Sequence, residues 1–267
     1  AGARAALLDE VQAAVPEPRL VDVFRLKYDY HNAKALVKGE ATGADVRRLL
    51  VSGGRYSCRQ LLEGFQKDAL SGVSARFQQA VAAARRTLAD TRDPQQCDIL
   101  LDKACYEEMA RLAEDCASPF LKGYVRLCAD TANLRTAVRV ARMGKGSDFL
   151  LHVLLPGGSV AESALAAARP EDLGSLFQAG ALEKAARLGA RAAQPDGGPL
   201  LAFERECDNA LTRYVAAAKR VPFGEEPVIA FLHAKDAELT AVRTILSSRR
   251  AGLDEAMIWE RLRECYV

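Results

Sequence analysis

Three segments of the chain share one pattern of apolar and polar positions. Their polar anchors, Asn32, Asn133 and Glu238, recur at intervals of about 100 residues. The first, fourth and seventh positions after each anchor are apolar or small, namely Ala33, Leu36 and Gly39, then Leu134, Ala137 and Val140, then Leu239, Val242 and Ile245. Such spacing places these positions on one face of a helix. Each segment therefore predicts an anchor helix that turns one face toward a core.

Features on either side of the anchors recur with them. The glycine pairs 53–54 and 157–158 follow the first two anchors, while Asp102 and Asp208 precede the second and third at similar distances. Because glycine tolerates positive φ, the pairs predict turns. A repeat of about 100 residues is too long for tetratricopeptide, ankyrin or HEAT arrays, whose periods are about 33 to 47 residues. Each copy is therefore predicted to be a small subdomain.

The remaining pattern predicts an all-α fold with three similar helical subdomains. Further helices are expected over 77–89, 96–116, 171–193 and 204–219. No window of four or more residues alternates strictly between turn signals, which argues against strands. The predicted subdomains cover residues 1–70, 71–168 and 169–267. The first copy has no counterpart of Asp102, so we expect it to be truncated at its N-terminus.

Composition narrows the class of protein. Hydrophobic residues make up 49% and charged residues 27%, as in an ordinary globular protein. The net charge of +2 gives no electrostatic reason to expect a nucleic acid as partner. No apolar run approaches the roughly 20 residues that cross a bilayer, so no membrane span is predicted. The seven cysteines form no C-x-x-C pair, which favours reduced thiols in a cytosolic protein.

Motifs that carry chemistry are absent from the sequence. The histidines, His31, His152 and His233, are scattered and form no H-E-x-x-H motif. The segment 144–147 contains glycines and a lysine but lacks the order of a phosphate-binding loop. Adjacent acidic residues such as Glu107 and Glu108 are interpreted as solvated. The sequence therefore predicts no catalytic residue, no metal site and no cofactor.

A basic stripe follows the repeat and is the main polar signal. Arg135, Arg139 and Arg142 share one helix face, Lys34 and Lys38 hold matching places in the first copy, and the third copy has Arg243 nearby. One interpretation is a surface that binds an acidic or carbonyl-rich partner, because arginine presents a rigid fork of donors. With the polar anchors, the candidate partner-binding residues are Asn32, Lys34, Lys38, Asn133, Arg135, Arg139, Arg142, Glu238 and Arg243. The alternative is that the basic residues bridge neighbouring copies or face water, and that the anchors satisfy buried backbone groups.

These residues give the chain a resemblance to a known family. In order along the chain, it resembles the C subunit of V-type and archaeal-type rotary ATPases, which is called the d subunit in eukaryotes. The ordered set is more specific than any single motif. The matching stretches are 29–36, 100–104, 120–139, 155–158, 207–211, 223–228, 235–246 and 261–267.

The resemblance implies both an architecture and a role. It implies three subdomains around a pseudo-threefold axis, forming a funnel, in a family whose members carry more sequence upstream. The implied role is a non-catalytic central-stalk component that joins the D and F subunits of the rotating shaft to the membrane proteolipid ring. Torque through it would couple ATP hydrolysis or synthesis to ion transport. We expect the protein to be cytoplasmic, peripheral to the membrane and monomeric when isolated; the alternative is a generic all-helical adaptor or scaffold.

Overall fold

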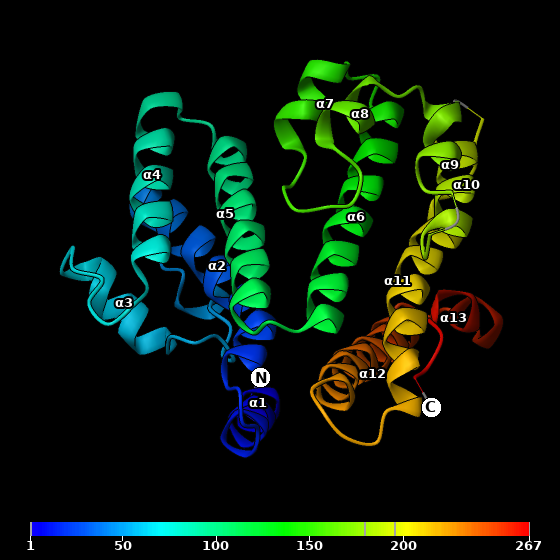
Figure 1. Cartoon of the computed structure of the whole chain (residues 1–267). Helices are drawn as coiled ribbons and strands as arrows, with labels where there is room; N and C mark the ends of the chain where they lie inside the picture. Colours follow the sequence, from blue (N-terminus) through cyan, green and yellow to red (C-terminus); the bar gives the residue numbers. More distant parts are fainter. Residues whose placement is uncertain (1, 179, 195, 267) are drawn as a thin grey trace. The chain divides into compact units, whose positions relative to one another are not determined.

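The computed structural model describes residues 2–178, 180–194 and 196–266, and these residues form helices and no strand. The predicted all-α class is therefore confirmed. The chain divides into two compact units, Ala1–Ala117 (unit 1) and Ser118–Val267 (unit 2) (Figure 1). The boundary between the units falls inside the predicted second subdomain, 71–168. The division into three subdomains and their threefold arrangement stay predictions.

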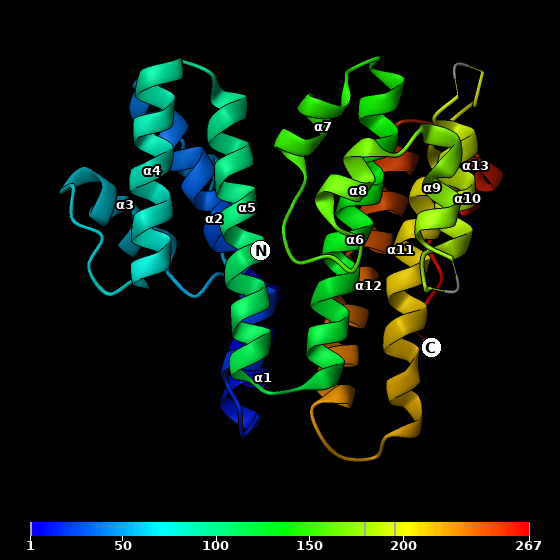
Figure 2. The ribbon, with the colours of Figure 1, turned by 45° about the horizontal axis from the view of Figure 1, so that its top comes forward.

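Unit 1 is built around one long helix, the first anchor helix. Its elements are α1 (Gly2–Ala14), α2 (Arg19–Thr42), η1 (Arg47–Leu49), α3 (Cys58–Gln66), α4 (Ala75–Thr91) and α5 (Pro94–Asp115). Helix α2 carries Asn32 and packs against α4 and α5, which lie beside each other (Figure 2). The core between them is apolar and includes Leu26, Tyr30, Leu36, Phe77, Val81, Cys97 and Leu101.

Local capping explains where the helices of unit 1 begin and end. Ser74 accepts a hydrogen bond from the Phe77 N–H, and Asp93 accepts one from the Gln95 N–H, each at a helix N-terminus. Pro94 occupies the first turn of α5, where a missing N–H costs nothing. Helix α2 ends at Gly43, which has a φ of 67°. The helices predicted over 77–89 and 96–116 are thus confirmed, with slightly different bounds.

Unit 2 contains the second and third anchor helices. Its elements are α6 (Pro119–Arg142), α7 (Ser147–Val153), α8 (Glu162–Ala167), η2 (Pro170–Asp172), α9 (Leu173–Leu176), α10 (Glu183–Ala192), α11 (Leu201–Ala216), η3 (Ala217–Arg220), α12 (Glu226–Arg250) and α13 (Glu255–Arg261). Helix α6 carries Asn133 and packs against α10, α11 and the start of α12. The helix predicted over 204–219 corresponds to α11 and η3.

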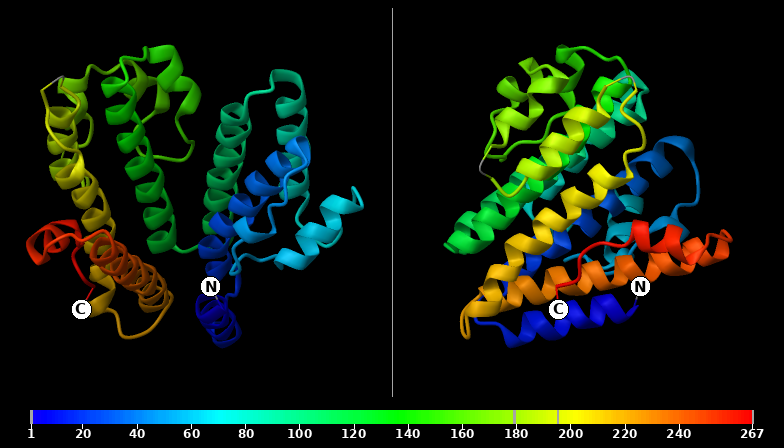
Figure 3. Two further views of the ribbon diagram at one scale, coloured as in Figure 1. Left: turned by 180° about the vertical axis from the view of Figure 1, so that it is seen from behind. Right: turned by 90° about the vertical axis from the view of Figure 1, so that its right-hand side faces the viewer.

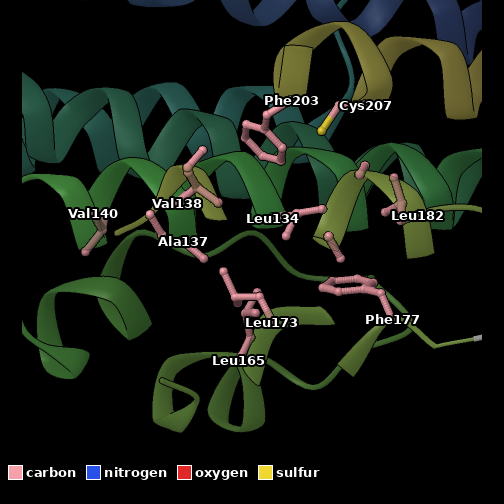
Figure 4. Close-up of a cluster of buried hydrophobic side chains, with 14 of the residues drawn as sticks. Leu134, Ala137, Val138, Val140, Leu165, Leu173, Phe177, Leu182, Phe203 and Cys207 are labelled. Carbon is pink, nitrogen blue, oxygen red and sulfur yellow. The ribbon is translucent and has the colours of Figure 1, made fainter. Parts of the chain in front are cut away.

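The core of unit 2 lies on both sides of α6. Figure 4 shows side chains of α6 between those of α11 on one side and those of α8, α9 and the turn after α9 on the other. The predicted apolar face of the second anchor helix is therefore confirmed. The labelled side chains are Leu134, Ala137, Val138, Val140, Leu165, Leu173, Phe177, Leu182, Phe203 and Cys207.

The prediction of one continuous helix over 171–193 is wrong. The structure has η2 and α9 up to Leu176, and α10 begins only at Glu183. Phe177 and Leu182 lie in the connection between α9 and α10, and both are buried in the core of unit 2. Burying both side chains against α6 requires the chain to turn here, and tertiary packing overrides the helical pattern.

The third anchor helix differs from the first two. Ile229 and Leu232, in the N-terminal half of α12, are buried, but Leu239 and Val242 beyond Glu238 are exposed. The sequence predicts that these positions face a core, and in the described residues they do not. The physical reason is that α13 is the helix that follows α12, and it packs only beside its C-terminal end (Figure 3).

Candidate functional site

The asparagine anchors of α2 and α6 bind the loop that follows their own helix. The Asn32 amide donates to the Val51 carbonyl at 2.9 Å and accepts from the Val51 N–H at 2.8 Å. The Asn133 amide makes the same two bonds to Leu155, both at 2.8 Å. These contacts match the alternative interpretation, in which a polar anchor satisfies buried backbone groups.

An aspartate one helical turn before each asparagine binds the same loop. Asp29 accepts a hydrogen bond from the Tyr56 N–H at 3.3 Å. Asp130 accepts from the N–H and the hydroxyl of Ser159, at 2.7 and 2.6 Å. Both carboxylates are buried. The Asp and Asn pair thus forms a two-point clamp, which recurs in the first two copies.

The glycine pairs complete the clamps. The first glycine of each pair has positive φ, 114° at Gly53 and 91° at Gly157, as the sequence predicts. The second glycine lies against the aspartate. A Cβ atom at Gly54 would lie 2.2 Å from the Asp29 Oδ1 atom, and one at Gly158 would lie 2.5 Å from the Asp130 Oδ1 atom. Each pair therefore combines a turn with a close approach to a carboxylate.

Replacing Gly158 by alanine should lower the free energy of unfolding by about 1–3 kcal/mol, because the added methyl group overpacks the clamp. Gly146→Ala is the matched control, since its Cβ would meet nothing within 4 Å. Chemical unfolding followed by circular dichroism measures both. Equal stability of the two variants would contradict the clamp.

The predicted basic stripe forms ion pairs inside each unit. The pairs are Lys34–Asp102 (2.5 Å), Lys38–Asp98 (2.9 Å), Arg135–Asp208 (2.5 Å) and Arg139–Glu204 (2.6 Å). Arg142 donates to the Gly198 carbonyl at 2.7 Å. These contacts fit the interpretation that the basic residues bridge successive copies of the repeat. A role of the same residues in partner binding stays a prediction.

The third copy places its candidates differently. Glu238 is exposed and pairs with Lys235 on the same helix at 2.8 Å. Arg243 is exposed, and among the described residues it makes no ion pair. The candidates from the first two copies and those from the third therefore do not form one cluster.

A buried charge network in unit 1 escaped the sequence analysis. The Arg55 guanidinium pairs with Asp29 and Glu108, both at 2.8 Å. Glu108 also accepts hydrogen bonds from the hydroxyls of Tyr30 (2.8 Å) and Ser74 (3.1 Å). Glu108 is buried, so the interpretation of it as a solvated residue is wrong. We call these five residues the Arg55 network.

The two carboxylates of the Arg55 network have pKa values shifted in opposite directions. Burial raises the pKa of Asp29 to about 6, although hydrogen bonds from Arg55 oppose the shift. Burial also acts to raise the pKa of Glu108. The hydrogen bonds and charge of Arg55, with those of Tyr30 and Ser74, outweigh burial and hold that pKa below its ordinary value. Because both carboxylates are buried, the network joins α2, α4 and α5 rather than facing a substrate.

Asp29 should make part of the stability of unit 1 depend on pH. Its folded pKa of about 6 lies above the unfolded value of about 3.9. Its contribution is therefore fully present below pH of about 4 and is lost as pH rises through about 6. The stability of the wild type relative to Asp29→Asn should fall between these limits. Unfolding curves at several pH values measure it, with the exposed Asp45→Asn as control; a flat or rising difference for Asp29→Asn would contradict the prediction.

Other groups that could react are closed off or isolated. Burial raises the pKa values of the Cys105 and Cys207 thiols to about 12, so both stay protonated and poorly nucleophilic. Cys265 is exposed. Among the described residues, no group of three or more His, Cys, Asp or Glu side chains could hold a metal ion. Within the same part of the chain, no helix combines the length and apolar character that a bilayer crossing requires.

A groove of unit 1 runs along the C-terminal half of α2. Its volume is about 1180 Å³, and Val46, Phe65 and Leu88 contribute apolar lining. Arg85 stacks over the Phe65 ring, 4.5 Å from its centroid, and pairs with Glu40 at 2.7 Å. No histidine or cysteine is among the lining residues. The groove therefore offers an apolar surface and no arrangement for nucleophilic catalysis.

Comparison with known proteins gives a family match over almost the whole chain. The model of the ATP synthase (C/AC39) subunit family matches residues 4–261.

Several known proteins are similar over most of their own length. The C subunit of the V-type sodium ATPase of Enterococcus hirae is 23% identical, over 98% of this chain and 80% of that protein. The C subunit of the V-type ATP synthase of Thermus thermophilus is 28% identical, over 97% and 81%. The C subunit of the A-type ATP synthase of Haloferax volcanii is 28% identical, over 88% and 71%.

Proposed function

Because this chain belongs to the ATP synthase (C/AC39) subunit family, we propose that it is the non-catalytic coupling component in the central stalk of a rotary ATPase. It joins the D and F subunits of the rotating shaft to the membrane proteolipid ring, on the cytoplasmic side and peripheral to the membrane. Torque that passes through it couples ATP hydrolysis or synthesis to ion transport. The observation that carries the proposal is the family match over residues 4–261.

The internal construction of each unit supports a mechanical role. A protein that transmits torque must resist deformation, and closely packed helices have low compressibility. The clamps tie α2 and α6 to the loops that follow them. Ion pairs and the apolar cores tie the same helices to α5 and α11. Each anchor helix is thus held from several sides.

The chemistry of the described residues supports the absence of an active site. The carboxylates with strong hydrogen bonding, Asp29, Asp130 and Glu108, are buried and occupied by internal donors. The thiols of Cys105 and Cys207 are buried as well. Groups in such surroundings hold a fold together and do not meet a substrate.

The proposal is tested by assembling the ATPase with and without this chain. We expect the tagged chain to co-purify with the D and F subunits of the shaft and with the proteolipid ring. Vesicles that contain the complete ATPase should take up ions when ATP is added. Vesicles prepared without the chain should hydrolyse ATP but take up no ions. Equal ion uptake in both preparations would rule out the coupling role and favour a general adaptor.

A further inference from the structure

The C-terminal half of α12 exposes an apolar stripe whose counterparts are buried in the first two copies. The exposed fractions at the first and fourth positions after the anchor are 0% and 4% for Ala33 and Leu36, 0% and 3% for Leu134 and Ala137, and 37% and 48% for Leu239 and Val242. Leu246, one turn further along α12, is 64% exposed. The apolar pattern of the repeat is thus kept in the third copy, but its cover is missing.

The N-terminal half of α12 is fixed to the rest of unit 2. Ile229 and Leu232 are buried. His233 lies between two hydroxyls, with Nδ1 at 3.1 Å from Tyr124 of α6 and Nε2 at 3.2 Å from Thr212 of α11. The exposed stripe is therefore the continuation of a helix that is held firmly at its other end.

The internal repeat indicates what kind of element fits such a stripe. In unit 1, α5 packs along α2, and in unit 2, α11 packs along α6. The covering helices contribute Cys97 and Leu101 in one unit, and Phe203 and Cys207 in the other. After α12 the described residues provide α13, which buries Ser248 but leaves Leu246 open. By this homology, the missing cover is an amphipathic helix.

Polar positions around the stripe define the chemistry of that helix. Thr240 and Thr244 stand where the first two copies have basic residues paired with carboxylates. Their hydroxyls donate to backbone carbonyls of α12 itself, so these positions need no acidic partner. Arg243 stands where Val37 and Val138 are buried in the other copies. A helix that covers the stripe must therefore offer a carboxylate to Arg243.

Exposed charge extends the same preference. Arg249 and Arg250 end α12, and both are exposed. Within the described part of the chain, neither forms an ion pair. With Arg243 they give the C-terminal end of α12 a positive character, which favours an acidic partner.

We propose that Leu239, Val242, Leu246 and Arg243 form a docking surface for an amphipathic α-helix of another subunit of the rotary ATPase, with its apolar face on the stripe and a carboxylate opposite Arg243. The inference rests on the proposed function, because the partner is taken from the same complex.

A photo-crosslinking residue at position 246 tests the identity of the partner. Benzoylphenylalanine replaces Leu246 in the chain, which is then assembled with the other ATPase subunits and irradiated. The expected result is a cross-link to a helical segment of one other subunit, identified by mass spectrometry. The matched control carries the same residue at Met143, which is 60% exposed on the same unit, and it should not give this cross-link.

A charged double variant tests the energetics of the surface. Val242→Asp with Leu246→Asp should weaken retention of the cross-linked subunit at least about tenfold, because two carboxylates would enter an apolar contact. Both side chains are exposed, so the unfolding midpoint of the isolated chain should stay unchanged. Met143→Asp should retain the subunit as the wild type does.

The outcomes separate this inference from the proposed function. A cross-link to a second copy of the chain or to lipid, or no cross-link while the chain stays in the assembly, would overturn the docking surface alone. Undiminished retention of the double variant would do the same. A wild-type chain that joins no ATPase subunit would instead refute the proposed function and this inference with it.

Discussion

Arg55→Ala should lower the free energy of unfolding of unit 1 by about 3–5 kcal/mol, the usual cost of removing one partner from a buried ion pair. Arg55 is the counterion of both Asp29 and Glu108, and both carboxylates are buried. Without the guanidinium, two negative charges would face each other away from water. Urea unfolding followed by far-ultraviolet circular dichroism measures the loss.

The control for Arg55 is an arginine in the same unit with an exposed ion pair. Arg59 pairs with Glu63 along α3 at 2.7 Å, and its side chain is 89% exposed. Water solvates both partners of such a pair, so Arg59→Ala should leave the unfolding curve unchanged. If Arg55→Ala were as stable as Arg59→Ala, the Arg55 network would not stabilise the fold.

Phe203→Ala should destabilise unit 2 by about 3–5 kcal/mol, as expected for truncating a buried phenylalanine. Its ring fills the space between α10, α11 and α6. A Cβ at Gly189 would lie 2.9 Å from the ring, and one of the nearest neighbours on α6 is Val138. The surrounding helices are fixed by ion pairs, so they can close the resulting cavity only in part. Thermal and urea unfolding measure the effect.

The control for Phe203 is Phe223, which is 86% exposed on the loop before α12. Phe223→Ala removes the same atoms without creating a cavity and should leave stability unchanged. A loss of similar size in both variants would show that side-chain volume alone, rather than burial, governs the result.

Sequence spacing predicts the anchor helices well because helical periodicity is a local property. Leu134 and Ala137 occupy the predicted face of α6 and are buried. The glycine pairs are similarly local, and Gly53 and Gly157 adopt the positive φ that the pattern predicts. The continuous helix over 171–193 fails for the opposite reason. Burial of Phe177 and Leu182 depends on the distant helix α6, which short-range spacing does not describe.

The partners of the basic residues were beyond the reach of spacing. In the sequence, Asp102 moves with Asn133, but in the structure it pairs with Lys34, 68 residues away. Asp208 likewise pairs with Arg135, 73 residues away. The carboxylate of each pair therefore belongs with the anchor that precedes it. Glu108 was missed for a similar reason, since its donors Arg55 and Tyr30 lie on other elements.

The contrast between the buried and exposed thiols makes the chain convenient for site-selective labelling. Cys97, Cys105 and Cys207 are buried, whereas Cys265 near the C-terminus is exposed. Maleimide reagents attack accessible thiolates, so a brief reaction should modify Cys265 ahead of these three. A fluorophore attached there would report rotation of the protein in single-molecule recordings, without an engineered cysteine.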